Sequence, residues 1–470
     1  MSATATTEKK YLKWYQKLAY GSGDLASNCS YGLVSSFVLL YLTGTLGLDS
    51  AIIGSLMLAS KVLDGISDVI FGTLIDRTHS KLGKARPWML FGQVGVSLCL
   101  FLLFAIPAGS TTIQYIYFFI VYTALNAVFY TANGIAYSSL VALITKNNNE
   151  RVQLGSFRFM FAVVTNIFMG FAVTGMVEKF GSGAAGWRTT ALIFAIVGLV
   201  VNTISCLAVK ELPEEELSGN ASEAAEEGKA VAEEKKHGFA ETAKILVHNK
   251  YYLMILAIYI VYYIMSNLTT GAGVFCATYY WGDGSLLGQF SMMKMFPVII
   301  ALAIAPVLIK KTGSMQKVNF WGYAISSVLG IPMIYFAMQK NLSMFLLFMF
   351  IKGVFAGTLS GSLNALIAEA SGYTTRTTGV HMDGMMYSCS SLGVKVGGGI
   401  GTAAVGWLLK LGGFVGTATV QSESAIRMIF NLYITFPFVI GIIITVLLAF
   451  LDVEKANKKW DAEHQKEAQA

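Results

Sequence analysis

The chain has 470 residues, of which 55% are hydrophobic and only 13% are charged. A soluble domain carries about 25% charged residues because its surface faces water, so this composition excludes a soluble protein and predicts that lipid surrounds most of the chain. The net charge of +7 does not predict a nucleic-acid partner, because the basic residues gather in short loops, in one polar linker and at the termini.

The sequence also lacks the motifs of nucleotide and metal sites. It has no G-x-x-x-x-G-K-[ST] loop, which disfavours an ATP-driven pump. The five cysteines are far apart, without the C-x-x-C spacing of zinc or redox sites, and are interpreted as small buried hydrophobic residues. We therefore expect no cofactor beyond a coupling ion.

The N-terminal lead is polar, carries lysines and lacks the apolar core of a signal peptide. Apolar stretches of about 20 residues then follow, each long enough to cross about 30 Å of hydrocarbon as a helix. Several are longer, so tilted or broken helices are expected. Twelve spans are predicted, at 21–46, 50–75, 87–107, 113–145, 155–177, 186–209, 250–280, 285–309, 318–339, 342–370, 380–411 and 425–451.

The loops between the predicted spans alternate in charge. Lysine and arginine gather after spans two, four and eight and in the C-terminal tail, whereas the loops at 43–50, 107–114 and 282–285 contain neither. Basic loops stay on the cytoplasmic side. We therefore predict a multi-pass protein of the cell membrane with both termini in the cytoplasm.

A linker rich in Glu, Ala and Lys divides the chain into two halves. The predicted regions are a lead at 1–20, a six-helix bundle at 21–209, the linker at 210–247, a second bundle at 248–451 and a tail at 452–470. Leu-Ile-Asp-Arg-Thr at 74–78 and Leu-Ile-Lys-Lys-Thr at 308–312 occupy corresponding positions after spans two and eight. Chance similarity is the alternative, but a six-plus-six duplication is the arrangement of a major facilitator transporter with a site between its halves.

Span two carries the strongest group of ionisable residues. Each such residue costs about 3 kcal/mol in the middle of a membrane helix. Lys61, Asp64 and Asp68 share one helix face. Repulsion between the two carboxylates favours a shared proton or a bound Na⁺ or Li⁺. The alternative is a structural Lys61–Asp64 pair with Asp68 near the interface.

Span eleven carries Lys395, flanked by Ser390, Ser391 and the glycines at 397–399. A buried lysine needs a carboxylate, and span two offers one if the halves face each other. The alternative is a lysine that extends towards the membrane interface.

Spans one, four and five supply the hydrogen-bonding groups and aromatic faces that carbohydrate recognition needs. These are Asp24, Asn28, Asn126, Tyr130, Thr131, Asn133, Tyr137 and Arg158. Each is as suited to a bond with a neighbouring helix as to a ligand. In span seven, Tyr262, Tyr263 and Asn267 are candidates for facing a cavity, whereas the tyrosines near its ends are interpreted as interfacial anchors.

Four motifs carry a resemblance to a known family. They are Gly23-Asp24-x-x-x-Asn28, Lys61-x-x-Asp64-x-x-x-Asp68, Asp76-Arg77-x-x-x-Lys81-x-Gly83-Lys84-x-Arg86-Pro87-Trp88, and Gly379-Val380-x-x-Asp383-Gly384 followed by Tyr387, Ser388 and Lys395. From Tyr20 to about Lys459 the chain resembles the glycoside–pentoside–hexuronide:cation symporters, the melibiose-carrier branch of the major facilitators. The resemblance implies an all-α membrane protein with the major facilitator fold, twelve helices in two six-helix halves.

The resemblance also implies site residues. The implied cation site comprises Asp64, Ser67, Asp68 and Thr131, with Lys395 as their positive partner. The implied sugar site comprises Asn28, Tyr137 or Ser138, and Arg158, with Ser390 and Ser391 where helix eleven contributes polar groups. Asp24 and Asn133, from the polar groups of spans one and four, complete the predicted sugar residues.

Some positions depart from the melibiose carrier. Two acids on its helices one and four hold sugar hydroxyls, and Asn28 and Gly134 occupy those places here. The loss of both carboxylates beside a retained Arg158 argues against melibiose and fits glucuronide or pentoside transporters better. His381 and Asp383 replace the Arg and Glu that relatives carry, which leaves a gating role there open.

The predicted function is secondary active transport, in which a monomer carries a glycoside, pentoside or hexuronide with Na⁺ or H⁺ by alternating access. Asp76, Arg77, Lys84 and Arg86 are expected to hold the cytoplasmic side shut through pairs between helices. One alternative is a non-transporting sugar sensor, for which the linker and tail leave no room for a signalling domain. The other is a membrane enzyme, for which no nucleophile–base pair is found.

Overall fold

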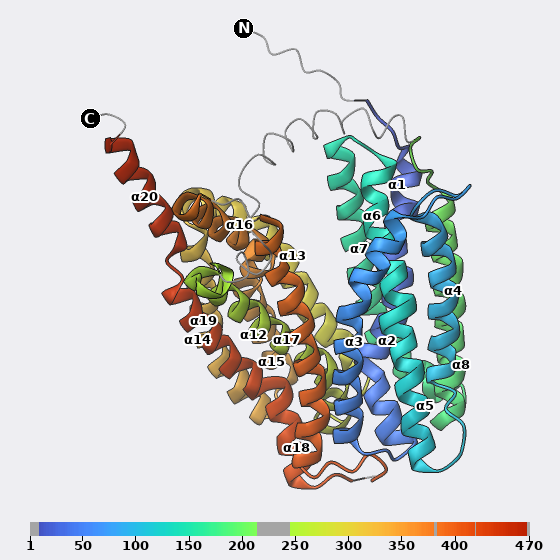
Figure 1. The fold of residues 1–470 in the computed structure, drawn as a ribbon. Coiled ribbons are helices and arrows are strands. Elements are labelled where there is room, and N and C mark those ends of the chain that lie inside the picture. The colour runs from blue at the N-terminus through green and yellow to red at the C-terminus, as the bar shows by residue number, and fades with distance from the viewer. Residues whose placement is uncertain (1–8, 214–244, 380–382, 419, 468–470) are drawn as a thin grey trace. The chain divides into compact units, whose positions relative to one another are not determined.

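The computed structural model describes residues 9–213, 245–379, 383–418 and 420–467, and every regular element in these ranges is a helix. The chain divides into two compact units, Met1–Gly228 with Val415–Val420, and Lys229–Phe414 with Gln421–Ala470. In Figure 1 the helices of the first unit run from blue to green and those of the second from yellow-green to red.

Polar side chains fix where several helices of the first unit begin. Asp49 accepts a hydrogen bond from the N–H of Ala51 at 2.9 Å, and Asn147 accepts one from Glu150 at 3.1 Å, which satisfies donors that have no partner within the helix. The helices are α1 (Trp14–Gly21), α2 (Gly23–Leu40) with η1 (Tyr41–Thr45), α3 (Ser50–Asp76), α4 (Arg86–Leu103), α5 (Thr111–Thr123) with η2 (Ala124–Tyr130) and α6 (Thr131–Ile144), α7 (Asn148–Lys179) and α8 (Gly183–Leu207).

The second unit repeats this pattern of long helices and short connections. Its helices are α12 (Lys250–Phe275) with η3 (Cys276–Tyr280), α13 (Leu286–Thr312), α14 (Met315–Met338), α15 (Leu342–Ala356), α16 (Thr358–Thr378), α17 (Asp383–Leu411), α18 (Glu423–Phe430) with η4 (Asn431–Thr435) and α19 (Phe436–Phe450), and α20 (Val453–Glu467). Gly357 separates α15 from α16, and a Cβ there would lie 2.7 Å from the Cβ of Ala301 on α13. The predicted span at 342–370 is therefore two helices joined at a close contact.

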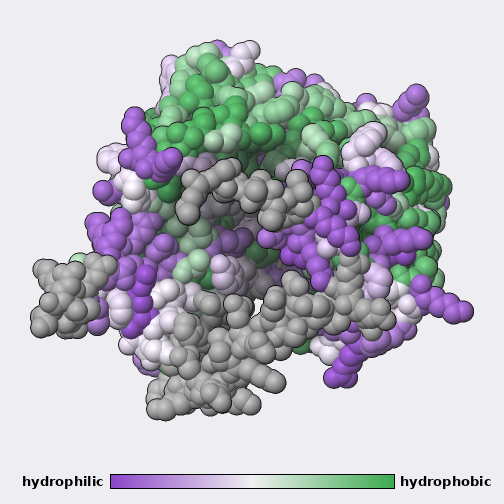
Figure 2. All heavy atoms as spheres, turned by 90° about the horizontal axis from the view of Figure 1, so that it is seen from above, coloured by the Kyte–Doolittle hydropathy of each residue, from purple (hydrophilic) through white to green (hydrophobic). Residues whose placement is uncertain are grey.

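Eleven helical segments in the described part of the chain are long and apolar enough to cross a membrane. α3 is not among them, although its 27 residues would extend about 40 Å, and it carries Lys61, Asp64 and Asp68. Large apolar side chains stay exposed on the helices, with Val69 at 73% and Phe91 at 70%, as expected where lipid replaces water. Figure 2, which looks onto the helix ends at the top of Figure 1, shows many hydrophilic side chains there.

The ends of the chain contain more helix than the sequence predicted. α1 covers residues 14–20 of the predicted lead at 1–20, and α20 occupies most of the predicted tail at 452–470. The predicted linker at 210–247 lies largely outside the described residues.

One carboxylate in each unit caps a helix from a distant part of the sequence. Glu211, which follows α8, accepts hydrogen bonds from the backbone N–H groups of Lys84, Ala85 and Arg86 at 2.7, 2.9 and 3.0 Å, where α4 begins. Glu454, at the start of α20, accepts from the N–H of Met315 at 2.8 Å, where α14 begins. A negative charge is favourable at a helix N-terminus. In each unit, the helix of the third predicted span is therefore held by a residue that follows the sixth span.

Replacing Glu211 by Ala should destabilise the first unit by about 1–2 kcal/mol, because three N–H groups lose a charged acceptor. We expect a lower midpoint of thermal unfolding for the purified protein in detergent. Glu463→Ala is the control, because this side chain is 59% exposed and its ion pair with Lys459 spans 3.8 Å, so it should leave the midpoint unchanged. Equal midpoints for both variants would contradict the role of the cap.

Candidate functional site

Asp64 of α3 is held by two side chains. The hydroxyl of Thr131, at the start of α6, donates to Asp64 Oδ1 at 2.7 Å. Lys61 Nζ lies 3.4 Å from the other oxygen, Oδ2. The Asp64 and Lys61 side chains are 14% and 19% exposed, so the group is partly shielded from solvent. The structure brings together the predicted Asp64 and Thr131, and it also forms the alternative Lys61–Asp64 pair.

The π-helical segment η2 positions Thr131. A π-turn contains one more residue than an α-turn and changes which side of the helix the next residues face. Thr131 Oγ1 also lies 2.9 Å from the carbonyl of Asn126, five residues earlier, which is the second acceptor near its single hydroxyl proton. The preceding Tyr130 stacks on Tyr31 of α2 with ring centroids 5.5 Å apart. The hydroxyl that reaches Asp64 is therefore fixed by an irregular turn and a ring contact.

A second cluster joins α2, α6 and α7. Arg158 Nε donates to Asp24 Oδ2 at 2.6 Å, and the two side chains are 25% and 18% exposed. The Tyr137 hydroxyl lies 3.3 Å from the same oxygen, and the nearer acceptor for its single proton is the Tyr20 carbonyl at 2.8 Å. The Arg158 guanidinium lies 4.2 Å from the centroid of the Tyr137 ring. Asp24, one of the predicted sugar residues, therefore supplies a carboxylate beside Arg158, one turn before Asn28.

One face of α2 connects the two clusters. Asp24, Asn28 and Tyr31 follow the spacing i, i+4, i+7, which places them on one side of a helix. Asn28 accepts a hydrogen bond from Asn166 of α7 at 2.9 Å. Lys61 Nζ lies 6.0 Å from the centroid of the Tyr31 ring. A rotation or shift of α2 would therefore change contacts in both the Asp64 cluster and the Arg158 cluster.

Ser67 and Asp68 share α3 with Asp64. The Ser67 hydroxyl donates to the backbone carbonyl of Asp64 at 2.9 Å, so its proton is directed to its own helix. Asp68 is half-buried one turn further along. Their roles as cation ligands stay predictions.

Two predicted sugar residues on α6 lie away from the Arg158 cluster. Asn133 is 3% exposed, and its Nδ2 donates to the Met89 carbonyl at 3.0 Å and to Gln93 Oε1 at 3.1 Å, both on α4. This geometry is that of a bond between neighbouring helices. Ser138 is exposed.

The remaining predicted site residues belong to the second unit. Lys395 is half-buried in the middle of α17, and Ser391 is exposed on the same helix. Ser390 donates to a backbone carbonyl of its own helix at 2.8 Å. His381 and the side chain of Asp383 lie outside the described residues. The pairing of Lys395 with the acids of α3 stays a prediction.

The predicted gate residues cluster around the connection between α3 and α4. Asp76 and Arg77 are exposed at the end of α3. Arg86 is 9% exposed, and its Nε donates to the Cys206 carbonyl of α8 at 3.2 Å, which fixes it within its own unit. The closing role of these residues, and of Lys84, stays a prediction.

Sequence reasoning missed two lysines inside the predicted spans of the second unit. Lys294 lies on α13 and Lys352 on α15, and both line a cavity within that unit. The same rule that drew attention to Lys395, that an ionisable residue inside a span needs an explanation, would have found both.

Comparisons with known proteins add to this geometry. A family model described as MFS/sugar transport protein matches residues 19–455. The isoprimeverose transporter of Lactiplantibacillus pentosus is 26% identical over 466 residues, covering 98% of this chain and 93% of that one. The inner membrane symporter YicJ of Escherichia coli (strain K12) is 25% identical over 426 residues, covering 90% and 88%. A crystal structure of a bacterial homolog of the human lysosomal transporter Spinster, inward-facing and unoccupied, has a TM-score of 0.65 at 13% identity, covering 95% of this chain and 97% of that one, which shows a shared fold.

Proposed function

Because the chain belongs to the MFS/sugar transport family, we propose that it carries a glycoside, pentoside or hexuronide across the cell membrane together with Na⁺ or H⁺. Its family and its relatives are membrane transporters, several of them named symporters, so the protein is a transporter rather than an enzyme. A sugar is supported as the cargo by the family description and by the isoprimeverose relative.

The observation that carries the coupling proposal is the charge of the group around Asp64. Lys61 contributes +1 and Asp64 and Asp68 contribute −2, so this face of α3 has a formal charge of −1. One monovalent cation or one proton brings it to zero, which lowers the cost of exposing it to a low-dielectric environment. Carboxylate and hydroxyl oxygens, as supplied by Asp64 and Thr131, are suitable ligands for a hard cation.

Lys61 would give the cation site two states, one in which Lys61 pairs with Asp64 and one in which the cation has displaced it. In the observed geometry its ammonium group lies beside Asp64 Oδ2 at 3.4 Å. An incoming cation would compete with that ammonium group for the carboxylate, and the displacement of Lys61 would change its contact with Tyr31 on α2. Since α2 also carries Asp24 and Asn28, cation binding would alter the Arg158 cluster, where we place the sugar.

The sugar would bind where Asp24, Tyr137 and Arg158 meet. A carboxylate and a guanidinium offer an acceptor and several donors, and a ring face packs against the apolar side of a pyranose. Sugar binding must then raise cation affinity by the same factor by which the cation raises sugar affinity. Alternating access of the two units would carry both inward.

Flux in proteoliposomes tests this function. We expect the purified protein to accumulate a sugar from a panel of isoprimeverose, a glucuronide and melibiose when an inward Na⁺ gradient is imposed at fixed pH, or when a pH gradient is imposed without Na⁺. The responsive gradient identifies the coupling ion, and the accumulated sugar identifies the substrate class. Accumulation of none of the three under either gradient would overturn the proposal.

A further inference from the structure

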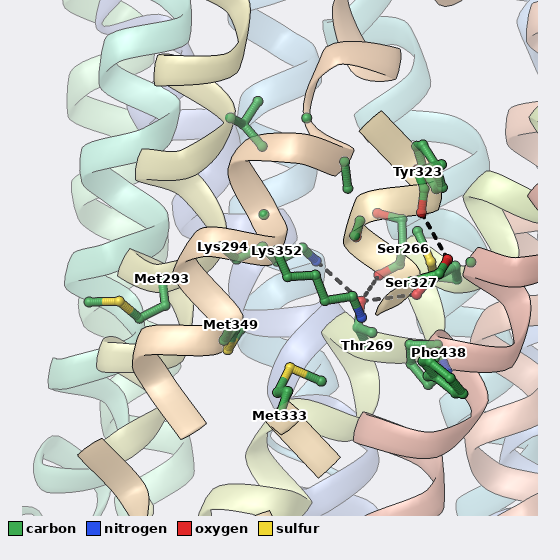
Figure 3. Close-up of a pocket in the computed structure, with 18 of the residues that line it drawn as sticks. Ser266, Thr269, Met293, Lys294, Tyr323, Ser327, Met333, Met349, Lys352 and Phe438 are labelled. Carbon is green, nitrogen blue, oxygen red and sulfur yellow. Dashed lines mark hydrogen bonds between the residues drawn. The ribbon is translucent and has the colours of Figure 1, made fainter. Parts of the chain in front are cut away.

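A cavity of about 180 Å³ lies inside the second unit, between helices α12, α13, α14, α15 and α19. Neither the candidate cation site nor the Arg158 cluster includes its residues. Two lysines, Lys294 and Lys352, line it together with hydroxyl-bearing and apolar side chains. Figure 3 shows both lysine side chains directed into the cavity and towards Thr269 of α12.

The two lysines have only neutral neighbours in this cavity. Lys294 Nζ lies 3.1 Å from the hydroxyl of Thr270 and 3.4 Å from that of Thr269. Among the described residues, Lys352 makes no hydrogen bond or ion pair. None of the described residues that line the cavity is Asp or Glu. Glu369 of α16 is not among the lining residues, and its carboxylate accepts a hydrogen bond from Asn457 at 2.7 Å.

Two ammonium groups without a carboxylate in one cavity repel each other and are costly inside a membrane protein. Such a group is retained where it meets an opposite charge. Since the described residues of the lining supply none, a bound anion would provide the opposite charge.

A third group in the cavity is a donor without a partner. Tyr323 is 2% exposed and lines the cavity, and its hydroxyl has no hydrogen-bond partner among the described residues. A buried donor left unpaired costs about 1–3 kcal/mol. Two ammonium groups and a phenolic O–H are matched by an anionic group with several acceptor oxygens.

We propose that Lys294, Lys352 and Tyr323 form a second binding site, separate from the Arg158 cluster, for a carboxylate-type oxyanion, the acid group of a transported sugar. This proposal rests on the proposed function only in taking the anion to be part of the cargo. Of the three proposed cargo classes, glycoside, pentoside and hexuronide, it selects the hexuronides, which carry an acid group.

The rest of the lining fits a molecule that is apolar beside its charge. Met333, Met349 and Phe438 line the same cavity as the lysines, as Figure 3 shows. Methionine side chains are flexible and polarisable and adapt to differently shaped partners. The site therefore suits an acidic sugar that carries a variable apolar substituent better than a bare inorganic anion.

Equilibrium binding to the purified full-length protein in nanodiscs tests the site, with Na⁺ and ionic strength held constant. The probes are a phenyl glucuronide, the matched phenyl glucoside without the acid, and acetate. We expect the glucuronide to bind at least about tenfold more tightly than the glucoside, which corresponds to one charge-assisted hydrogen bond. Lys294→Gln and Lys352→Gln should each remove most of this difference, while Lys310→Gln, at the exposed end of α13, should retain it.

Two further variants separate binding from folding. Lys352→Arg keeps the charge and should retain preference for the acid. Tyr323→Phe removes a hydroxyl that has no partner in the unliganded protein, so it should not lower thermal stability but should weaken glucuronide binding several-fold.

The outcomes are distinct. If acetate binds as tightly as the glucuronide and depends on the same lysines, the oxyanion site is supported but its occupant is a free anion, which overturns its assignment to the cargo. Equal binding of glucuronide and glucoside, or glucuronide affinity unchanged in Lys294→Gln/Lys352→Gln, overturns the site itself. The binding measurement needs no ion gradient, so failed accumulation would overturn the proposed function and leave this result standing.

Discussion

Replacing Asp64 by Asn should abolish cation-driven sugar accumulation while the protein still folds and binds sugar. The Asn amide oxygen still accepts the hydrogen bond that Thr131 now donates to Asp64 at 2.7 Å. The carboxylate charge is lost, however, so the formal charge of this face of α3 is already zero before any cation binds. Loss of a charged ligand costs about 2–3 kcal/mol, or about a hundredfold in cation affinity. Uptake driven by the coupling ion and exchange of labelled sugar at equilibrium would measure the two effects separately.

The control for this variant is Asp283→Asn, in the connection before α13, where Asp283 accepts from the N–H of Ser285 at 2.8 Å. Asn makes the same bond, so accumulation should be unchanged. Asp68→Cys should behave as Asp64→Asn does, with sugar binding retained and concentrative uptake lost. Full accumulation by the Asp64 or the Asp68 variant would show that these acids are not the coupling site.

Replacing Arg158 by Gln should remove sugar binding and also destabilise the first unit. Arg158 and Asp24 form the 2.6 Å ion pair, and both side chains are less than a third exposed. Without the guanidinium, the Asp24 carboxylate stays shielded from solvent with only the weaker Tyr137 bond, at a cost of about 1–3 kcal/mol. We expect a lower unfolding midpoint together with at least a tenfold weaker sugar affinity.

A double-mutant cycle with Asp24→Asn separates stability from binding. In Asp24→Asn/Arg158→Gln no charge is left without its partner, so part of the lost stability should return. Sugar binding should stay lost, because both charged groups that we assign to the ligand are gone. Recovery of binding in the double variant would mean that the pair serves the fold alone.

The sequence was sufficient to predict the membrane-embedded, all-helical class and many helix limits. α3, for example, spans Ser50–Asp76, against a predicted 50–75. Hydropathy cannot place a break such as Gly357, because both flanking segments are apolar and the cause is a contact with Ala301 on another helix. The helical parts of the lead and tail were missed because polar helices give no membrane signal.

The candidate site was predictable where partners share a helix and less so where they do not. Lys61 and Asp64 could be paired from their spacing of three. The bond between Thr131 and Asp64 was implied by resemblance alone, because it depends on a π-turn that no spacing rule reveals. Asn133 was assigned to sugar because it is polar within a span, whereas its partners, Met89 and Gln93, lie on α4.

The caps made by Glu211 and Glu454 have a consequence for biosynthesis. The backbone N–H groups at the start of α4 are made 125 to 127 residues before their acceptor, so they have no charged partner until the sixth helix has left the ribosome. The same delay applies to α14, whose N-terminal N–H groups precede Glu454 by 138 and 139 residues. Since chains fold from the N-terminus as they are synthesised, each unit completes its own hydrogen bonding only when its last helix has been inserted. A ribosome that stalls before residue 211 would therefore leave the N–H groups at the start of α4 without this carboxylate.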